Sequence, residues 1–176
     1  TMLNQGDRVT GLLHRGADPH AKNNSGTTVL DMAEFLHRVD ITKRLLSSLK
    51  PEIADPKSEA GEIELLKAIR QNRPTTVHAL LEMGVRQNQL ADRQFYRSIL
   101  LLACCMSSSS ILHILVKYGP GVSVEQNEHL LVQVAWAAGN MDVVQAVRDF
   151  ADDEREAKLT YISAYKVCDF LSPLLC

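Results

Sequence analysis

Six histidines are the residues most able to hold a metal ion or move a proton, so their spacing is the first test for chemistry. Zinc sites typically use two histidines one helical turn apart, or histidines close to cysteines. No histidine pair in this chain has either arrangement. The six are His14, His20, His37, His78, His113 and His129. We expect turn and surface histidines, with no metal and no cofactor.

Cys104 and Cys105 are the best candidates for a nucleophile, because the two thiols are adjacent on a predicted helix. A catalytic thiol needs a base within reach and a lowered pKa, and no feature of the sequence assigns either. We expect Cys104 to be a small buried side chain, and the serines at 107–110 to form a turn and a helix cap. The chain also lacks nucleophile-elbow, phosphate-binding and dinucleotide-binding motifs. These features predict that the chain is not an enzyme.

Composition and charge restrict the classes of partner. The chain has 176 residues, of which 45% are hydrophobic, and this is typical of a soluble globular protein. A formal net charge of −2 supplies no broad positive field for phosphates, so we expect no nucleic-acid partner. No run approaches the roughly 18 apolar residues that cross a bilayer, so we expect no membrane insertion. The four cysteines do not resemble a secreted disulfide framework and predict an intracellular, reducing, cytoplasmic location.

The chain contains a repeated pattern that positions the histidines and cysteines. Ala33, Ala68 and Ala103 follow one another at steps of 35 residues, and Ala135 follows at a step of 32. Apolar residues precede each alanine, a polar break follows about five residues later, and a second apolar run comes next. We interpret each segment as a unit of two helices joined by a turn, and we call these four residues the register alanines. Their small side chains suit places where helices approach closely.

Residues 12–46 resemble one repeat of the ankyrin family, because they contain GADPHAKNNSGTTVLDMA and then VDITKRLL without gaps. Val29 and Asp31 stand where the family pattern has Pro and His. Since that His helps to brace the family's turn, we expect Asp31 to accept backbone N–H groups instead. The resemblance implies an all-α, ankyrin-type helix-turn-helix solenoid with short β-hairpin fingers, some of them lost or irregular. It places one well-formed hairpin at residues 17–28.

The repeat predicts a single ankyrin-like domain over residues 1–176. Its units are a partial one at about 1–16 and full ones at 17–50, 60–85, 95–120 and 127–151, followed by a C-terminal capping helix at 152–176. The partial first unit leaves open that the chain is a fragment of a larger protein. Trp136, next to Ala135, is expected to fill the core between the fourth unit and the tail.

The resemblance implies a protein–protein interaction module, a scaffold or adaptor that binds a partner protein or peptide on a concave surface of fingers and first helices. Two alternatives stay open. The chain could be a regulatory or targeting domain of a larger enzyme whose catalytic part lies elsewhere, or a structural subunit of an assembly. In isolation we expect a monomer.

Residues that contact partners in ankyrin repeats flank the turn of the finger and lie two and three positions after the alanine of the first helix. The matching residues here are Lys22, Asn24, Ser25, Thr27, Phe35, Leu36, Arg70, Gln71, Cys105 and Met106, with Ala137 and Ala138 in the fourth unit. Three of the four helical pairs are apolar, which predicts an exposed apolar stripe with Arg70 as its charged position. The alternative is that the irregular loops 47–62 and 85–97 cover the stripe and make it core.

We predict that all four thiols are free in the native protein, because the composition indicates a reducing compartment and adjacent cysteines on one helix pair poorly with each other. Thiol titration under denaturing, non-reducing conditions should count four. A count of two or none would contradict the assigned compartment.

Overall fold

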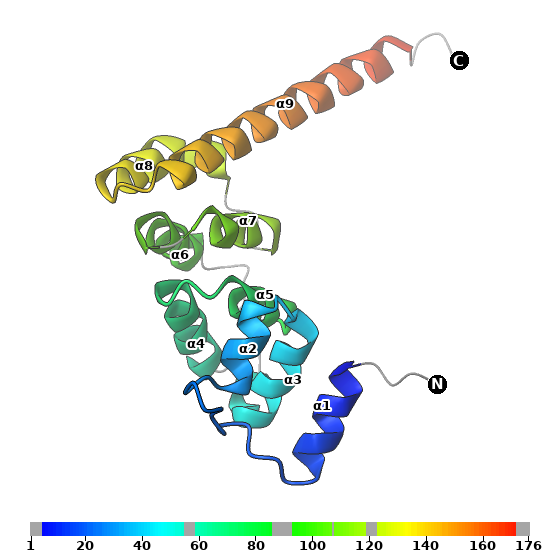
Figure 1. Cartoon of the computed structure of the whole chain (residues 1–176). Coiled ribbons are helices and arrows are strands. Elements are labelled where there is room, and N and C mark those ends of the chain that lie inside the picture. Colours follow the sequence, from blue (N-terminus) through cyan, green and yellow to red (C-terminus); the bar gives the residue numbers. More distant parts are fainter. Residues whose placement is uncertain (1–4, 55–58, 86–92, 107, 119–122, 172–176) are drawn as a thin grey trace.

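The chain is described by a computed structural model that covers residues 5–54, 59–85, 93–106, 108–118 and 123–171 (Figure 1). Every regular element in these ranges is a helix, which confirms the all-α prediction. The α-helices are α1 (Gln5–His14), α2 (Val29–Phe35), α3 (Val39–Leu49), α4 (Glu59–Arg70), α5 (Pro74–Glu82), α6 (Arg93–Met106), α7 (Ser109–Tyr118), α8 (Val124–Ala137) and α9 (Met141–Leu171). A short 3-10 helix, η1 (Pro51–Ala54), follows α3.

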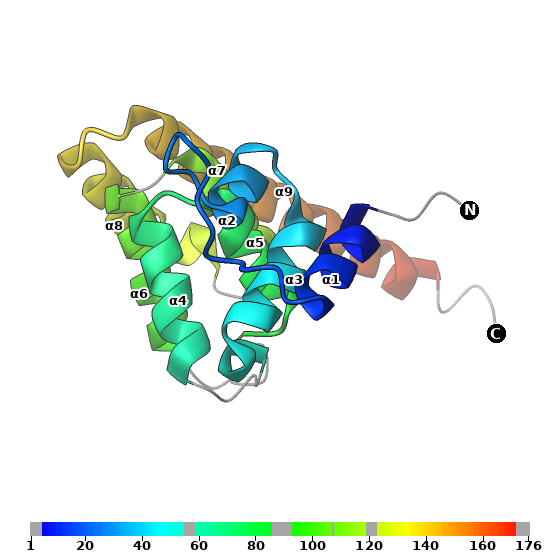
Figure 2. The ribbon, with the colours of Figure 1, turned by 60° about the horizontal axis from the view of Figure 1, so that its bottom comes forward.

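The helices stack in two rows. One row consists of α1, α3, α5, α7 and α9, each of which packs against the next (Figure 1). In the other row α4 packs against α6 and α6 against α8, while α2 packs against α3 and α5. Figure 2 shows α4, α6 and α8 along one side of the molecule and α1 and α3 on the other. Each unit therefore contributes a first helix (α2, α4, α6 or α8) and a second helix (α3, α5, α7 or α9).

The register alanines are buried in this packing, where each is between 0% and 4% exposed. The turn after them is built in the same way in three units. The carbonyl oxygens of Ala33, Ala68 and Ala135 each accept a hydrogen bond of 2.9 Å from the N–H five residues later. The residue before that donor has a positive φ in each case: His37 at 51°, Asn72 at 52° and Gly139 at 77°. Such a turn satisfies a carbonyl that the helix end would otherwise leave unpaired.

The N-terminal end of α2 is fixed by a reciprocal pair of hydrogen bonds between Thr28 and Asp31. The N–H of Asp31 donates to Thr28 Oγ1 at 3.1 Å, and the Thr28 N–H donates to Asp31 Oδ2 at 3.1 Å. Asp31 thus accepts a backbone N–H, as the sequence predicted. The hydrogen bonds from the Thr28 side chain and backbone, followed by the Arg73 guanidinium 2.7 Å away, hold the pKa of Asp31 below its usual range.

Histidines 35 residues apart make equivalent contacts in successive second helices. His78 on α5 stacks against Tyr118 of α7, with ring centroids 4.6 Å apart. His113 on α7 meets Phe150 of α9 edge to face at 4.7 Å. Each ring contacts an aromatic ring of the next unit, which is a structural role.

The predicted hairpin at residues 17–28 is reduced to one isolated antiparallel bridge, between Lys22 and Thr28. Asn23 closes the turn, because its Oδ1 accepts the N–H groups of Ser25 and Thr27 at 3.0 and 2.9 Å. No second finger pairs with this one in the described part of the chain, and a lone two-stranded hairpin is marginal in water. The solenoid with β-hairpin fingers is therefore not confirmed.

The predicted boundary between a fourth unit ending at 151 and a capping helix at 152–176 is absent. One helix, α9, runs from Met141 to Leu171, and Figure 1 shows its later part projecting past the stack. The segment contains no glycine or proline, so nothing in its local sequence ends the helix. Residues 172–176 lie outside the described part of the chain.

Replacing Ala103 by Leu should lower the free energy of unfolding by about 1–3 kcal/mol, because the alanine is fully buried between helices and the larger side chain overpacks the site. Lys22→Ala, an exposed change on the finger, is the control and should be close to neutral. Chemical denaturation compares the two variants. Equal midpoints would show that Ala103 is not a point of close approach.

Candidate protein-interaction surface

The surface formed by the first helices and the turns after them carries several exposed apolar side chains. Phe35 is 78% exposed, Leu36 52% and Met106 50%. Cys105, Ala137 and Ala138 are exposed as well, as are Arg70 and Gln71. The described parts of the loops at 47–62 and 85–97 therefore leave these predicted positions open to solvent. Exposed apolar side chains are unfavourable in water, so we treat this surface as the candidate for contact with another molecule.

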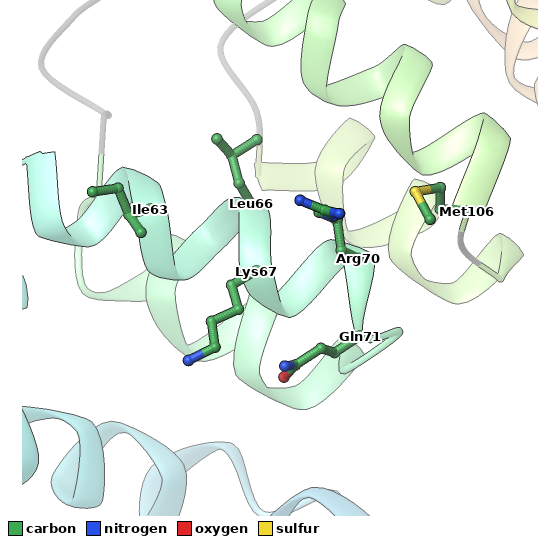
Figure 3. Close-up of a pocket in the computed structure, with 6 residues that line it drawn as sticks. All are labelled: Ile63, Leu66, Lys67, Arg70, Gln71 and Met106. Atoms are coloured by element: carbon green, nitrogen blue, oxygen red, sulfur yellow. The ribbon is translucent and has the colours of Figure 1, made fainter.

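A hollow lies between α4 and the C-terminal end of α6, and we call it the α4–α6 hollow. It has a volume of about 590 Å³. Four of its lining side chains project from α4, Gln71 follows directly after that helix, and Met106 comes from the end of α6 (Figure 3). The lining residues are Ile63, Leu66, Lys67, Arg70, Gln71 and Met106. Three of the predicted site residues, Arg70, Gln71 and Met106, are thus brought together in one place.

Helical spacing explains why α4 can serve both the core and this hollow. Leu65, Ala68 and Ile69 lie on one side of the helix and are buried. Ile63 and Lys67, spaced four residues apart, lie on the opposite side together with the other α4 residues of the hollow. Ile63 is 63% exposed although it is a large apolar residue.

Sequence reasoning missed Ile63, Leu66 and Lys67 as site residues. The signal that could have found them is the second face of α4, on which an isoleucine and two cations recur at helical spacing away from the apolar core face.

Two cations in the α4–α6 hollow have no acidic partner in the described part of the chain. Some other basic residues are paired, such as Lys43 with Glu82 at 2.7 Å and Lys50 with Glu64. No such ion pair joins Lys67 or Arg70 to a described carboxylate. The hollow therefore combines an apolar lining with two positive charges that face solvent.

A second, smaller cleft connects the finger to α4. It measures about 300 Å³, and Pro19, His20 and Thr28 from the finger segment line it opposite α4. Lys67 and Gln71 line both this cleft and the α4–α6 hollow. The surface is therefore continuous from the base of the finger to Met106.

The remaining predicted site residues line neither cavity. On the finger, Lys22, Asn24 and Ser25 are exposed and Thr27 is half-buried. Phe35 and Leu36 end the first helix of unit one, and Ala137 and Ala138 end that of unit four. The structure thus brings Arg70, Gln71 and Met106 together, whereas the predicted residues of the finger and of units one and four lie outside both cavities.

Trp136 was predicted to fill the core, and that prediction is wrong, because its side chain is 63% exposed. Two of the three equivalent residues one position after a register alanine, Ile69 and Cys104, are fully buried, and the third, Glu34, is half-buried. Each lies where the following unit stacks, and the described residues place no further helix pair beyond α8 and α9. Trp136 is exposed because it is on the last unit described.

Cys104 is buried and Cys105 exposed, and both are free thiols. Burial raises the pKa of the Cys104 thiol to about 12, so it stays protonated near neutral pH and is a poor nucleophile. Cys176 and the side chain of Cys168 lie outside what the structure describes.

No three histidine, cysteine or acidic side chains of the described residues gather into a group that could hold a metal ion. No helix in the described ranges has the length and apolar character needed to span a membrane.

Comparisons of the chain with models of protein families, with curated proteins and with solved structures found no match. The resemblance to ankyrin repeats therefore remains a prediction that depends on residues 12–46.

Proposed function

We propose that this chain is a protein-interaction module and that it binds a partner protein or peptide on the first-helix surface around the α4–α6 hollow. The observation that carries the proposal is the pair of exposed apolar side chains there, Ile63 at 63% and Met106 at 50% exposed, beside an open cavity. Soluble proteins seldom leave such groups together unless another molecule covers them. The resemblance of residues 12–46 to an ankyrin repeat supports the same class of function.

The chemistry of the surface also favours recognition over catalysis. The lining of the α4–α6 hollow offers aliphatic carbon, a thioether, two cations and an amide, but no carboxylate, thiol or imidazole. These groups suit contact with a polypeptide, since methionine adapts to the shape of its partner and arginine is frequent at the centre of interfaces.

Replacing Phe35 and Met106 together by Asp should abolish capture of the partner from native lysate while leaving thermal melting nearly unchanged. Both side chains are at least half exposed, so the carboxylates stay hydrated in the free protein but are desolvated in a complex. The measurement is a pull-down with the purified variant, accompanied by a melting curve.

The matched control replaces Leu12 and Leu159 by Asp, because these leucines are 56% and 68% exposed on the opposite row of helices. It should retain the partner. If both double variants lose the same proteins, or neither loses any, the surface assignment is wrong. Unfolding of the first variant would mean that Phe35 and Met106 are core.

A further inference from the structure

We infer that the α4–α6 hollow recognises a peptide segment of the partner that places a carboxylate next to an apolar anchor side chain. This inference rests on the proposed function and specifies the chemistry of the partner. Ile63, Leu66 and Met106 supply the apolar part of the lining, and Lys67 and Arg70 supply the charge (Figure 3).

The positive charge of the hollow is available because nearby carboxylates are engaged elsewhere. Asp31 accepts hydrogen bonds from Thr28 and from Arg73, the latter at 2.7 Å. Glu64, on α4 itself, pairs with Lys50. A partner's carboxylate would therefore meet two cations without having to displace an internal acid.

The helix dipole by itself also explains why Lys67 and Arg70 lie in the last turn of α4, since cations are favoured near its negative end. That effect explains the charges alone and requires no exposed apolar neighbour. Ile63 stands one turn before Lys67 and two turns before Arg70, and is 63% exposed. An apolar side chain kept in water directly beside two cations that pair with no described carboxylate is what a segment with both an apolar and an acidic residue would complement.

The size and openness of the hollow fit a peptide segment. About 590 Å³ holds a few side chains, and its wall is built from one helix face and the end of another. The adjoining finger cleft shares Lys67 and Gln71 with it, so a segment longer than the hollow could continue along α4 toward His20.

The test begins with a random peptide library displayed on phage and selected against the purified chain. Selected peptides should be enriched in Asp or Glu near a large apolar residue. Fluorescence anisotropy of a labelled selected peptide should then show affinity reduced at least about tenfold by Lys67→Glu with Arg70→Glu. Changing the acidic residues of the peptide to Lys should restore binding to this double variant.

The matched control reverses two exposed cations on the other row, Arg8→Glu with Arg148→Glu, which changes the net charge by the same amount. It should leave the affinity within about twofold, since charges beyond a Debye length are screened. Equal loss in both double variants would overturn the inference, because the effect would then come from the general field of the protein.

Ile63→Asp separates failure of this inference from failure of the proposed function. If it abolishes peptide binding but the selected peptides show no acidic enrichment, the surface binds peptides and the inferred chemistry is wrong. If neither Ile63→Asp nor the Phe35 and Met106 double variant weakens any selected peptide, the proposed surface fails as well. Ile63 is mostly exposed, so this variant is expected to fold.

Discussion

The stack depends on helix ends that are completed by the neighbouring unit. The Glu34 carboxylate accepts the N–H groups of Thr75 and Thr76 at 2.8 Å each, and so caps α5 from the unit before it. Asn72 in turn accepts the N–H and hydroxyl of Ser108, which precedes α7. At the next boundary the capping side chain comes from the later unit, where the Asn140 amide donates to the Cys104 and Cys105 carbonyls near the end of α6. Since a helix leaves several end groups unpaired, each unit requires the adjacent one to satisfy them.

This constraint also positions the candidate surface. The side chains that join units lie near the end of a first helix or in the turn after it, close in sequence to the buried register alanines. Fixing those turns brings the end of α6, with Met106, beside the exposed face of α4 (Figure 3). The hollow therefore exists because two units are held in register, and neither α4 nor α6 forms it alone.

Features set by neighbouring residues could be predicted from the sequence, and features set by other units could not. The alanine spacing located the helix pairs, and Asp31 was correctly expected to accept a backbone N–H. Trp136 looked like core because its neighbours are apolar, yet its exposure depends on whether a further unit covers it. Ile63 and Lys67 were missed because their importance comes from Met106, some 40 residues away in sequence. The lack of glycine and proline in this segment predicts a continuous helix, whereas the repeat pattern predicted a boundary after residue 151.

The most direct test of the account is a double-mutant cycle between Glu34 and Thr76, whose hydroxyl donates to the carboxylate at 2.7 Å across the first unit boundary. Glu34→Gln and Thr76→Val, singly and together, would be compared by chemical denaturation. Thr42→Val serves as the control partner, because this buried hydroxyl bonds to the Arg38 carbonyl instead. If the units are joined through their helix ends, Glu34 and Thr76 should show a coupling energy of about 1 kcal/mol or more. Additivity within about 0.5 kcal/mol, equal to that of the control pair, would contradict the claim that units are joined through their helix ends.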